Sequence, residues 1–66
     1  MTVHINGAAR PLADACSIAA LIAELGYTGK RIATERNGDI VPRSQYAAQI
    51  LNDGDKLEIV VAVGGG

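Results

Sequence analysis

The sequence predicts a single α+β domain of the β-grasp (ubiquitin-like) class, with a mixed sheet of four to five strands and one main helix packed on one face. Two observations predict this fold. Short β-rich segments stand on both sides of one amphipathic helical segment, in the order β-β-α-β-β-β. The first and last of these segments are rich in β-branched residues, as central strands are. We place the domain at residues 1–63 and a flexible C-terminal glycine tail at residues 64–66.

The first element is a hairpin. Residues 2–5, "TVHI", alternate and are β-rich, and Val3 and Ile5 are expected to face the core. The Asn-Gly pair at 6–7 is a strong hairpin signal because both positions tolerate positive φ. A second strand is therefore expected near residues 8–12.

A helix follows. Four apolar residues recur at helical spacing and form one stripe: Ile18, Leu21, Ile22 and Leu25. Ser17 precedes the stripe as a natural N-cap, and Gly26 stands just past its end, where a left-handed conformation is common. A helix this short is stable only when it packs on another element, which here is the sheet.

A second hairpin is predicted after the helix. Residues 31–36 form its first strand, a second Asn-Gly pair at 37–38 forms its turn, and residues 39–41 return as a short strand that Pro42 ends. In the first strand two residues point inward, Ile32 and Thr34, and two point outward, Ala33 and Glu35.

The last part of the domain carries the best strand. Ser44 is expected to cap a short helical turn, and residues 52–55, "NDGD", form a turn by composition. Residues 56–63, "KLEIVVAV", then form a strand. Its core face takes Leu57, Ile59, Val61 and Val63, and its other face takes Glu58, Val60 and Ala62.

Composition excludes several classes of function. The formal net charge is −1, from 6 basic and 7 acidic residues, and nucleic-acid binding normally needs a clustered basic excess. Cys16 is the single cysteine, so neither an intramolecular disulfide nor a metal site is indicated. We see no signal peptide and no apolar run of about 20 residues. We therefore expect a cytoplasmic protein with no bound cofactor or metal and with neither nucleic acid nor membrane as partner.

Four segments of the chain resemble the sulfur carriers of thiamin biosynthesis, the ThiS family. They are "VHINGAARPL" at the start, "RNGDIVPRSQY" in the middle, "LNDGDKLEIV" near the end, and the terminal "GGG". The most specific part is "IVPR", residues 40–43. Two residues of the third strand depart from the family by being polar, Thr34 and Arg36, and they are expected to loosen its packing.

The resemblance implies a carrier rather than an enzyme, with no catalytic residues of its own. It implies that an E1-like activating enzyme uses ATP to adenylate the carboxylate of Gly66. The adenylate then becomes a thiocarboxylate, with sulfur drawn from cysteine by a donor such as a cysteine desulfurase. Thiazole synthase receives that sulfur. Gly64 and Gly65 are the residues that enter the partner's active site.

The chemistry of the tail fits this role. A free α-carboxylate has a pKa near about 3.5, so it is a poor electrophile at neutral pH until adenylation supplies a leaving group. Glycine has no Cβ and can enter a narrow channel. Residues 63–66 can extend by about 13 Å. The alternative interpretation of the tail is a frayed chain end.

A docking surface is predicted on the sheet face away from the helix. Val60, Ala62 and Ala33 place apolar side chains there, and the strand leads directly into the tail. Arg43 is a further candidate contact, with a solvated surface residue as the favoured alternative interpretation. Ordinary exposed apolar surface is the alternative. Two residues that invite a chemical role are interpreted as structural: His4 as a surface residue, and Cys16 as a small, partly buried side chain.

Two other functions use the same activated Gly66. One is the small subunit of molybdopterin synthase, which is usually longer and tends to use Phe, a residue this chain lacks. The other is a ubiquitin-like modifier that forms isopeptide bonds with lysines. A plain interaction module with an inert tail is the remaining alternative.

Overall fold

The computed structural model describes residues 1–62, which form one mixed sheet and two short helices. The elements in chain order are β1 (Thr2–Ile5), β2 (Ala8–Pro11), α1 (Ile18–Glu24), β3 (Ile32–Arg36), β4 (Asp39–Val41), the 3-10 helix η1 (Arg43–Gln45) and β5 (Lys56–Val61). The strand order is β2-β1-β5-β3-β4, in which β1 and β5 run parallel and the other neighbours antiparallel. The last strand is therefore the central one, as its β-branched residues predict.

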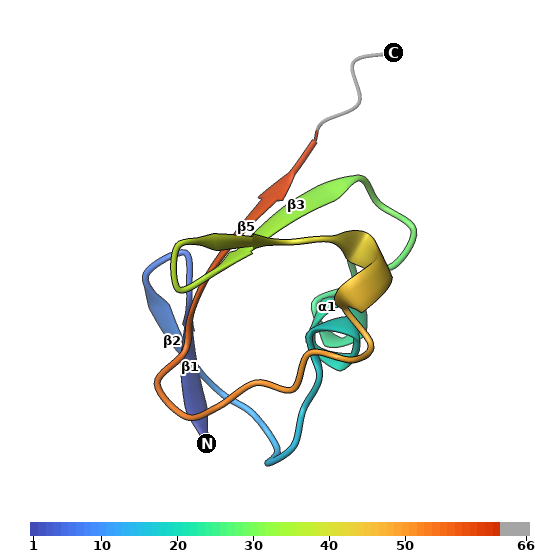
Figure 1. Ribbon diagram of the computed structural model, residues 1–66. Coiled ribbons are helices and arrows are strands. Elements are labelled where there is room, and N and C mark those ends of the chain that lie inside the picture. The colour runs from blue at the N-terminus through green and yellow to red at the C-terminus, as the bar shows by residue number, and fades with distance from the viewer. Residues whose placement is uncertain (63–66) are drawn as a thin grey trace.

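The helix α1 lies on one side of the sheet, and the hydrophobic core fills the space between them (Figure 1). Its apolar stripe is buried through Ile18, Leu21 and Ile22. Val3, Leu57 and Ile59 are the buried residues that β1 and β5 turn towards it. Figure 1 also shows that the N-terminus and the end of β5 lie at opposite ends of the molecule.

Local signals set the helix and the two hairpins as predicted. The Ser17 hydroxyl accepts a hydrogen bond from the Ala20 amide at 3.0 Å, and Gly26 has a φ of +79° just past the helix. Each hairpin turn has two residues at positive φ: Asn6 and Gly7 in one, Asn37 and Gly38 in the other. Two consecutive positive φ values define the type I′ turn that matches the twist of paired strands.

The third strand does not show the loose packing expected from its polar residues. Thr34 is only 1% exposed, and β3 is paired with β4 on one side and with β5 on the other. Its predicted alternation is confirmed, with Thr34 buried, Ile32 half-buried, and Ala33 and Glu35 exposed.

Three details of the prediction are wrong. Ser44 does not cap the short helical turn, because η1 already begins at Arg43 and Ser44 lies inside it. Pro42 stands at the cap position with φ −63° and ψ 146°, and it makes no side-chain hydrogen bond. The fixed φ of proline ends β4 and starts the turn two residues earlier than a cap at Ser44 would. The two other errors are strand ends: β2 ends at residue 11 and β5 at residue 61. Val63 and the predicted tail, residues 64–66, lie outside the described residues.

Candidate docking face and its supports

The face of the sheet opposite α1 carries the apolar residues that the sequence predicts there. Ala33 on β3 and Val60 on β5 are direct partners across the antiparallel pair. Both are exposed, and the Val60 side chain is 63% exposed. Their neighbours Thr34 and Ile59 are buried on the core side, which fixes the direction of both outward residues.

The other two predicted contacts lie differently. Ala62 is exposed one residue beyond β5, and its amide donates to the Arg31 carbonyl at 2.8 Å, so the pairing with β3 continues to that point. Arg43 is exposed at the start of η1, and its guanidinium donates to the Lys30 carbonyl at 3.1 Å. Among the contacts of residues 1–62, none joins Arg43 to Ala33 or Val60. The structure therefore groups Ala62 with β5 and ties Arg43 to the loop before β3.

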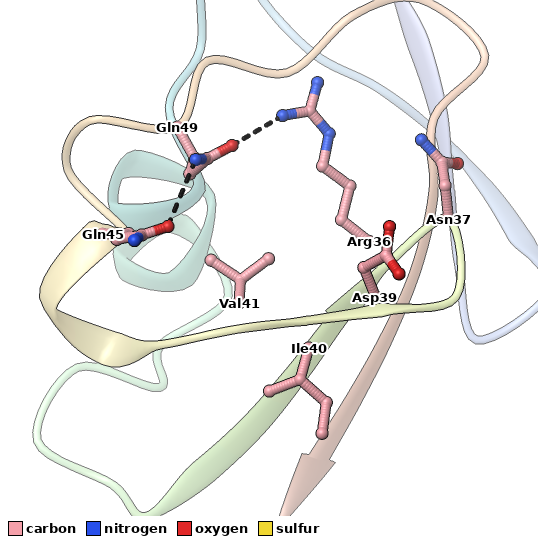
Figure 2. Close-up of a pocket in the computed structure, with 7 residues that line it drawn as sticks. All are labelled: Arg36, Asn37, Asp39, Ile40, Val41, Gln45 and Gln49. Atoms are coloured by element: carbon pink, nitrogen blue, oxygen red, sulfur yellow. Dashed lines mark hydrogen bonds between the residues drawn. The ribbon is translucent and has the colours of Figure 1, made fainter.

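Sequence reasoning missed Ile40, which is 79% exposed and is the most exposed of the large hydrophobic residues in the described chain. It stands on β4 opposite Glu35 of β3, on the outward face. Figure 2 shows Ile40 and Val41 projecting to opposite sides of the strand. The outward direction of Ile40 could have been inferred from the next residue. Val41 is apolar and pairs with inward-facing Thr34, so it faces the core. Its neighbour must then face outward.

Both hairpin turns are tied to β5 by an asparagine side chain. The Asn6 amide group replaces a strand partner for Ile59: its Oδ1 accepts from the Ile59 amide at 2.9 Å, and its Nδ2 donates to the Ile59 carbonyl at 3.0 Å. On the other side, Asn37 Oδ1 accepts from the Lys56 amide at 3.0 Å. The strand that leads to the tail is therefore held from both neighbouring hairpins.

Asp55 anchors the beginning of β5 from inside the fold. Only 7% of this residue is exposed. Its carboxylate accepts hydrogen bonds from three residues: Arg36 (Nε at 3.0 Å and Nη2 at 2.7 Å), Asn37 (Nδ2 at 3.1 Å) and Asn52 (backbone N at 2.8 Å). Burial raises the pKa of the Asp55 carboxyl, but these hydrogen bonds and the Arg36 charge outweigh burial and hold that pKa below its usual 3.8.

A pocket of about 300 Å³ opens beside this network, between β4 and η1 (Figure 2). Its polar wall is a chain in which Gln49 accepts from Arg36 Nη1 at 3.0 Å and donates to Gln45 at 3.4 Å. Nε and Nη2 of Arg36 are directed at Asp55. Because its guanidinium is already neutralised and hydrogen-bonded, the pocket offers no free cation for an anionic ligand.

The residues that invite a chemical role are placed as follows. His4 is exposed on β1, and Cys16 is half-buried with its Sγ 3.4 Å from the Ser17 carbonyl. Within residues 1–62 there is no group of three side chains able to hold a metal ion. The same part of the chain contains no helix long and apolar enough to cross a membrane. Gly66, the residue predicted to react, and Gly64 and Gly65, predicted to enter the partner's active site, lie outside the described residues.

Comparisons with known proteins add the whole-chain context. The ThiS family model matches residues 3–66. The chain is 48% identical over 66 residues to a thiazole synthase of Paramagnetospirillum magneticum, covering all of this chain and 20% of that protein. It is 33% identical to an uncharacterized protein, ycf40, of Pyropia yezoensis, covering 93% of that protein. The chain thus spans about a fifth of the length of the thiazole synthases that it matches.

A solved structure confirms the predicted fold class. The crystal structure of the thiamine biosynthesis protein ThiS from Geobacter metallireducens superposes with a TM-score of 0.84 and 26% identity, and the match covers 100% of both chains. The agreement therefore covers the sheet, the helix and their connections together.

Proposed function

We propose that this chain, which belongs to the ThiS family of sulfur carriers in thiamine biosynthesis, carries sulfur as a thiocarboxylate on Gly66. The observation that carries the proposal is the family match, which runs from residue 3 through the terminal glycines to residue 66. A member of this family is a carrier and not an enzyme, so the chemistry belongs to its partners. The chain supplies the reacting carboxyl group and the folded body that delivers it.

The first step is activation of the Gly66 carboxylate. One carboxylate oxygen attacks the α-phosphorus of ATP, and an acyl-adenylate forms as pyrophosphate leaves. A sulfur nucleophile then attacks the carbonyl carbon, and AMP leaves with the bonding electron pair. The product is a thiocarboxylate, whose sulfur is a better nucleophile than the oxygen of the original carboxylate. Sulfide gives the thiocarboxylate directly in this step. Where a cysteine desulfurase supplies the sulfur as a persulfide, the attack gives an acyl disulfide, and a second thiol reduces it to the thiocarboxylate while a disulfide forms.

The folded body would act as the handle for both partners. Val60 and Ala33 offer apolar contact area on the outward face, and Ala62 extends it towards the tail. We assign Arg43 to the margin of this surface. Fixing a flexible residue costs roughly 1–2 kcal/mol, so ordering three glycines needs compensation from such contacts. The hydrogen bonds from both hairpins to Lys56 and Ile59 hold β5, the last described strand, in a defined place.

The partners follow from the same proposal. They are an E1-like adenylating enzyme, which uses ATP, and a thiazole synthase, which receives the sulfur. Proteins named thiazole synthase contain a segment similar to this whole chain. The presence of this carrier-like segment in proteins named thiazole synthase supports thiazole synthase, in preference to molybdopterin synthase, as the acceptor of the sulfur.

The test is intact-protein mass spectrometry after incubation with ATP, a sulfide source and the adenylating enzyme. We expect the mass change of one oxygen replaced by one sulfur, located on Gly66 by fragmentation. A chain lacking Gly66 is the matched control and should stay unmodified. Sulfur should then pass to thiazole synthase in a reaction that a molybdopterin synthase cannot replace. An unchanged mass with an active enzyme, or conjugates through target lysines, would contradict the proposal.

A further inference from the structure

The outward face of the sheet contains a row of residues with two acidic side chains. An apolar docking surface made of Val60 and Ala33 does not by itself explain this row. Glu35 of β3 is the direct partner of Glu58 on β5 and of Ile40 on β4. The row therefore reads Glu58, Glu35, Ile40 across three strands. The neighbouring row contains Val60 and Ala33.

The fold holds the two glutamates together without compensation. Directly opposed residues in an antiparallel pair have Cβ atoms about 4.5–5.5 Å apart, and like charges there are destabilising. The ion pairs within residues 1–62 are Met1–Asp14, Arg10–Glu24 and Arg36–Asp55. None of them involves Glu35 or Glu58. Both residues are exposed, so water solvates their carboxylates.

Exposed hydrophobic residues lie around the two glutamates, and a partner that buries them also affects the glutamates. Ile40 is 79% exposed on one side of the glutamates, and Val60 is 63% exposed in the next row. A partner that covers these two side chains removes water from the carboxylates between them. Desolvated carboxylates need a cation, because burying a charge is costly unless it is paired.

We propose that the face from Val60 to Ile40 docks a thiazole synthase surface in which one basic side chain, held among apolar ones, is received by Glu35 and Glu58 together. This rests on the proposed function. Arginine suits the position best, since its planar fork can donate to two carboxylates at once. We choose thiazole synthase as the occupant because two proteins of that name contain, in the same polypeptide, a segment similar to this chain.

Two other occupants fit the charges badly. A second copy of this chain docking by the same face would bring four carboxylates together, at a cost in free energy. An anionic membrane surface would repel the pair in the same way. The face is therefore matched to a basic protein surface.

The test compares two double variants of equal charge. Glu35→Gln/Glu58→Gln removes the acidic pair, and Asp14→Asn/Glu24→Gln removes two charges elsewhere, on the loop before α1 and on α1 itself. Affinity for the thiazole synthase of the same organism is measured by calorimetry at low and high salt. We expect the first variant to bind about tenfold more weakly or worse and to lose most of the salt dependence. The control should bind as the unmodified chain does.

Thermal melting separates this effect from misfolding. Removing the opposed charges should leave the melting temperature unchanged or raise it, while binding falls. Equal affinities of the two variants, or a loss seen only with the adenylating enzyme, would overturn the inference. Sulfur loading of the unmodified chain is followed in parallel. If the unmodified chain accepts sulfur and the acidic pair makes no difference, only this inference fails and the proposed function stands.

Discussion

Asp55 is an acidic side chain that belongs to the core of this protein. The "NDGD" pattern predicts a turn, and the turn is present, but nothing in the pattern predicts that its last residue is buried. The reason is distance along the chain: the partner guanidinium is on Arg36, 19 residues earlier. Charged residues are almost never fully buried unless they are paired, and the pairing arises only in the folded chain.

This residue makes the stability depend on pH in a defined direction. The pKa of Asp55 in the folded state is lower than its usual 3.8. Its contribution is therefore complete above about pH 4 and is lost as the pH falls through the folded pKa. We expect Asp55→Asn to lower the free energy of unfolding by about 3 kcal/mol at pH 7, because Arg36 loses its buried partner. The difference in the free energy of unfolding between Asp55→Asn and the unmodified chain should narrow as the pH falls below 3.8 and through the lower folded pKa. Urea denaturation across this range measures both.

Asp39→Asn is the control for that experiment. Asp39 is exposed at the start of β4 and lines the neighbouring pocket, so the variant changes the same charge without opening the core. Its stability should stay within about 0.5 kcal/mol of the unmodified chain at every pH. A similar loss of stability in both variants would mean that net charge, and not the Arg36–Asp55 pair, determines how stability depends on pH in acid.

Cys16 tests whether a thiol contributes to sulfur chemistry here. Its Sγ is half-buried and directed to the Ser17 carbonyl, which is a structural environment. We predict that Cys16→Ser accepts sulfur on Gly66 to the same extent as the unmodified chain, with stability lowered by no more than about 1 kcal/mol. Mass spectrometry of the loaded variant is the measurement. A folded variant that cannot be loaded would give Cys16 a role in transfer.

Elements with local signals are predictable from this sequence, and elements defined by their neighbours are less so. Each Asn-Gly turn is encoded by its own two residues, and the helix is encoded by its own apolar spacing and the Ser17 cap that precedes it. The exposure of Ile40 was missed because its signal is indirect: the turn at 37–38 must first be used to align β4 with β3, which sets Ile40 opposite outward-facing Glu35. The start of η1 was predicted two residues late because the geometry of Pro42 outweighs the capping preference of serine.

The outward face of β5 supports a prediction about docking. Val60→Asn places a neutral amide where apolar contact area is proposed, so its effect is separate from that of the acidic pair. We expect the rate of adenylation at limiting carrier to fall about tenfold, since an unpaired polar group costs about 1–3 kcal/mol when buried. Thermal stability should hardly change, because this side chain is mostly exposed. ATP–pyrophosphate exchange measures the rate.

Ala48→Asn is the matched control, at an exposed position beyond η1. It makes a similar change away from the proposed surface and should leave exchange unaltered. If the Val60 variant also exchanges at the normal rate, the docking face is wrongly placed.

For the whole molecule, the proposed division is between a rigid body and a reactive end. The body was predictable because hydrophobic periodicity and turn residues agree along the chain. The role of Gly66 came from resemblance, since three glycines alone are equally typical of a frayed end. The outward surface was only half predicted, because Glu35, Glu58 and Ile40 become neighbours through strand pairing.

Adding one alanine after Gly66 should separate folding from loading. The reacting carbonyl carbon would move about 3.5 Å along the chain and gain a Cβ beside it. A displacement of about 1 Å can cost roughly a hundredfold in rate, so adenylation should be lost. The melting temperature should stay the same, since the change is far from packed features. Normal pyrophosphate exchange by the extended chain would remove Gly66 from the mechanism.

The central place of β5 has a consequence for biosynthesis. Before residues 56–61 are made, the chain contains two local hairpins that share no sheet contact, because only β5 lies between them. Pairing across long sequence separations is the slow part of folding. A nascent or truncated chain that stops short of β5 therefore has no completed outward face. On the docking hypothesis, recognition of this face therefore requires that β5 has been made and has paired with both hairpins.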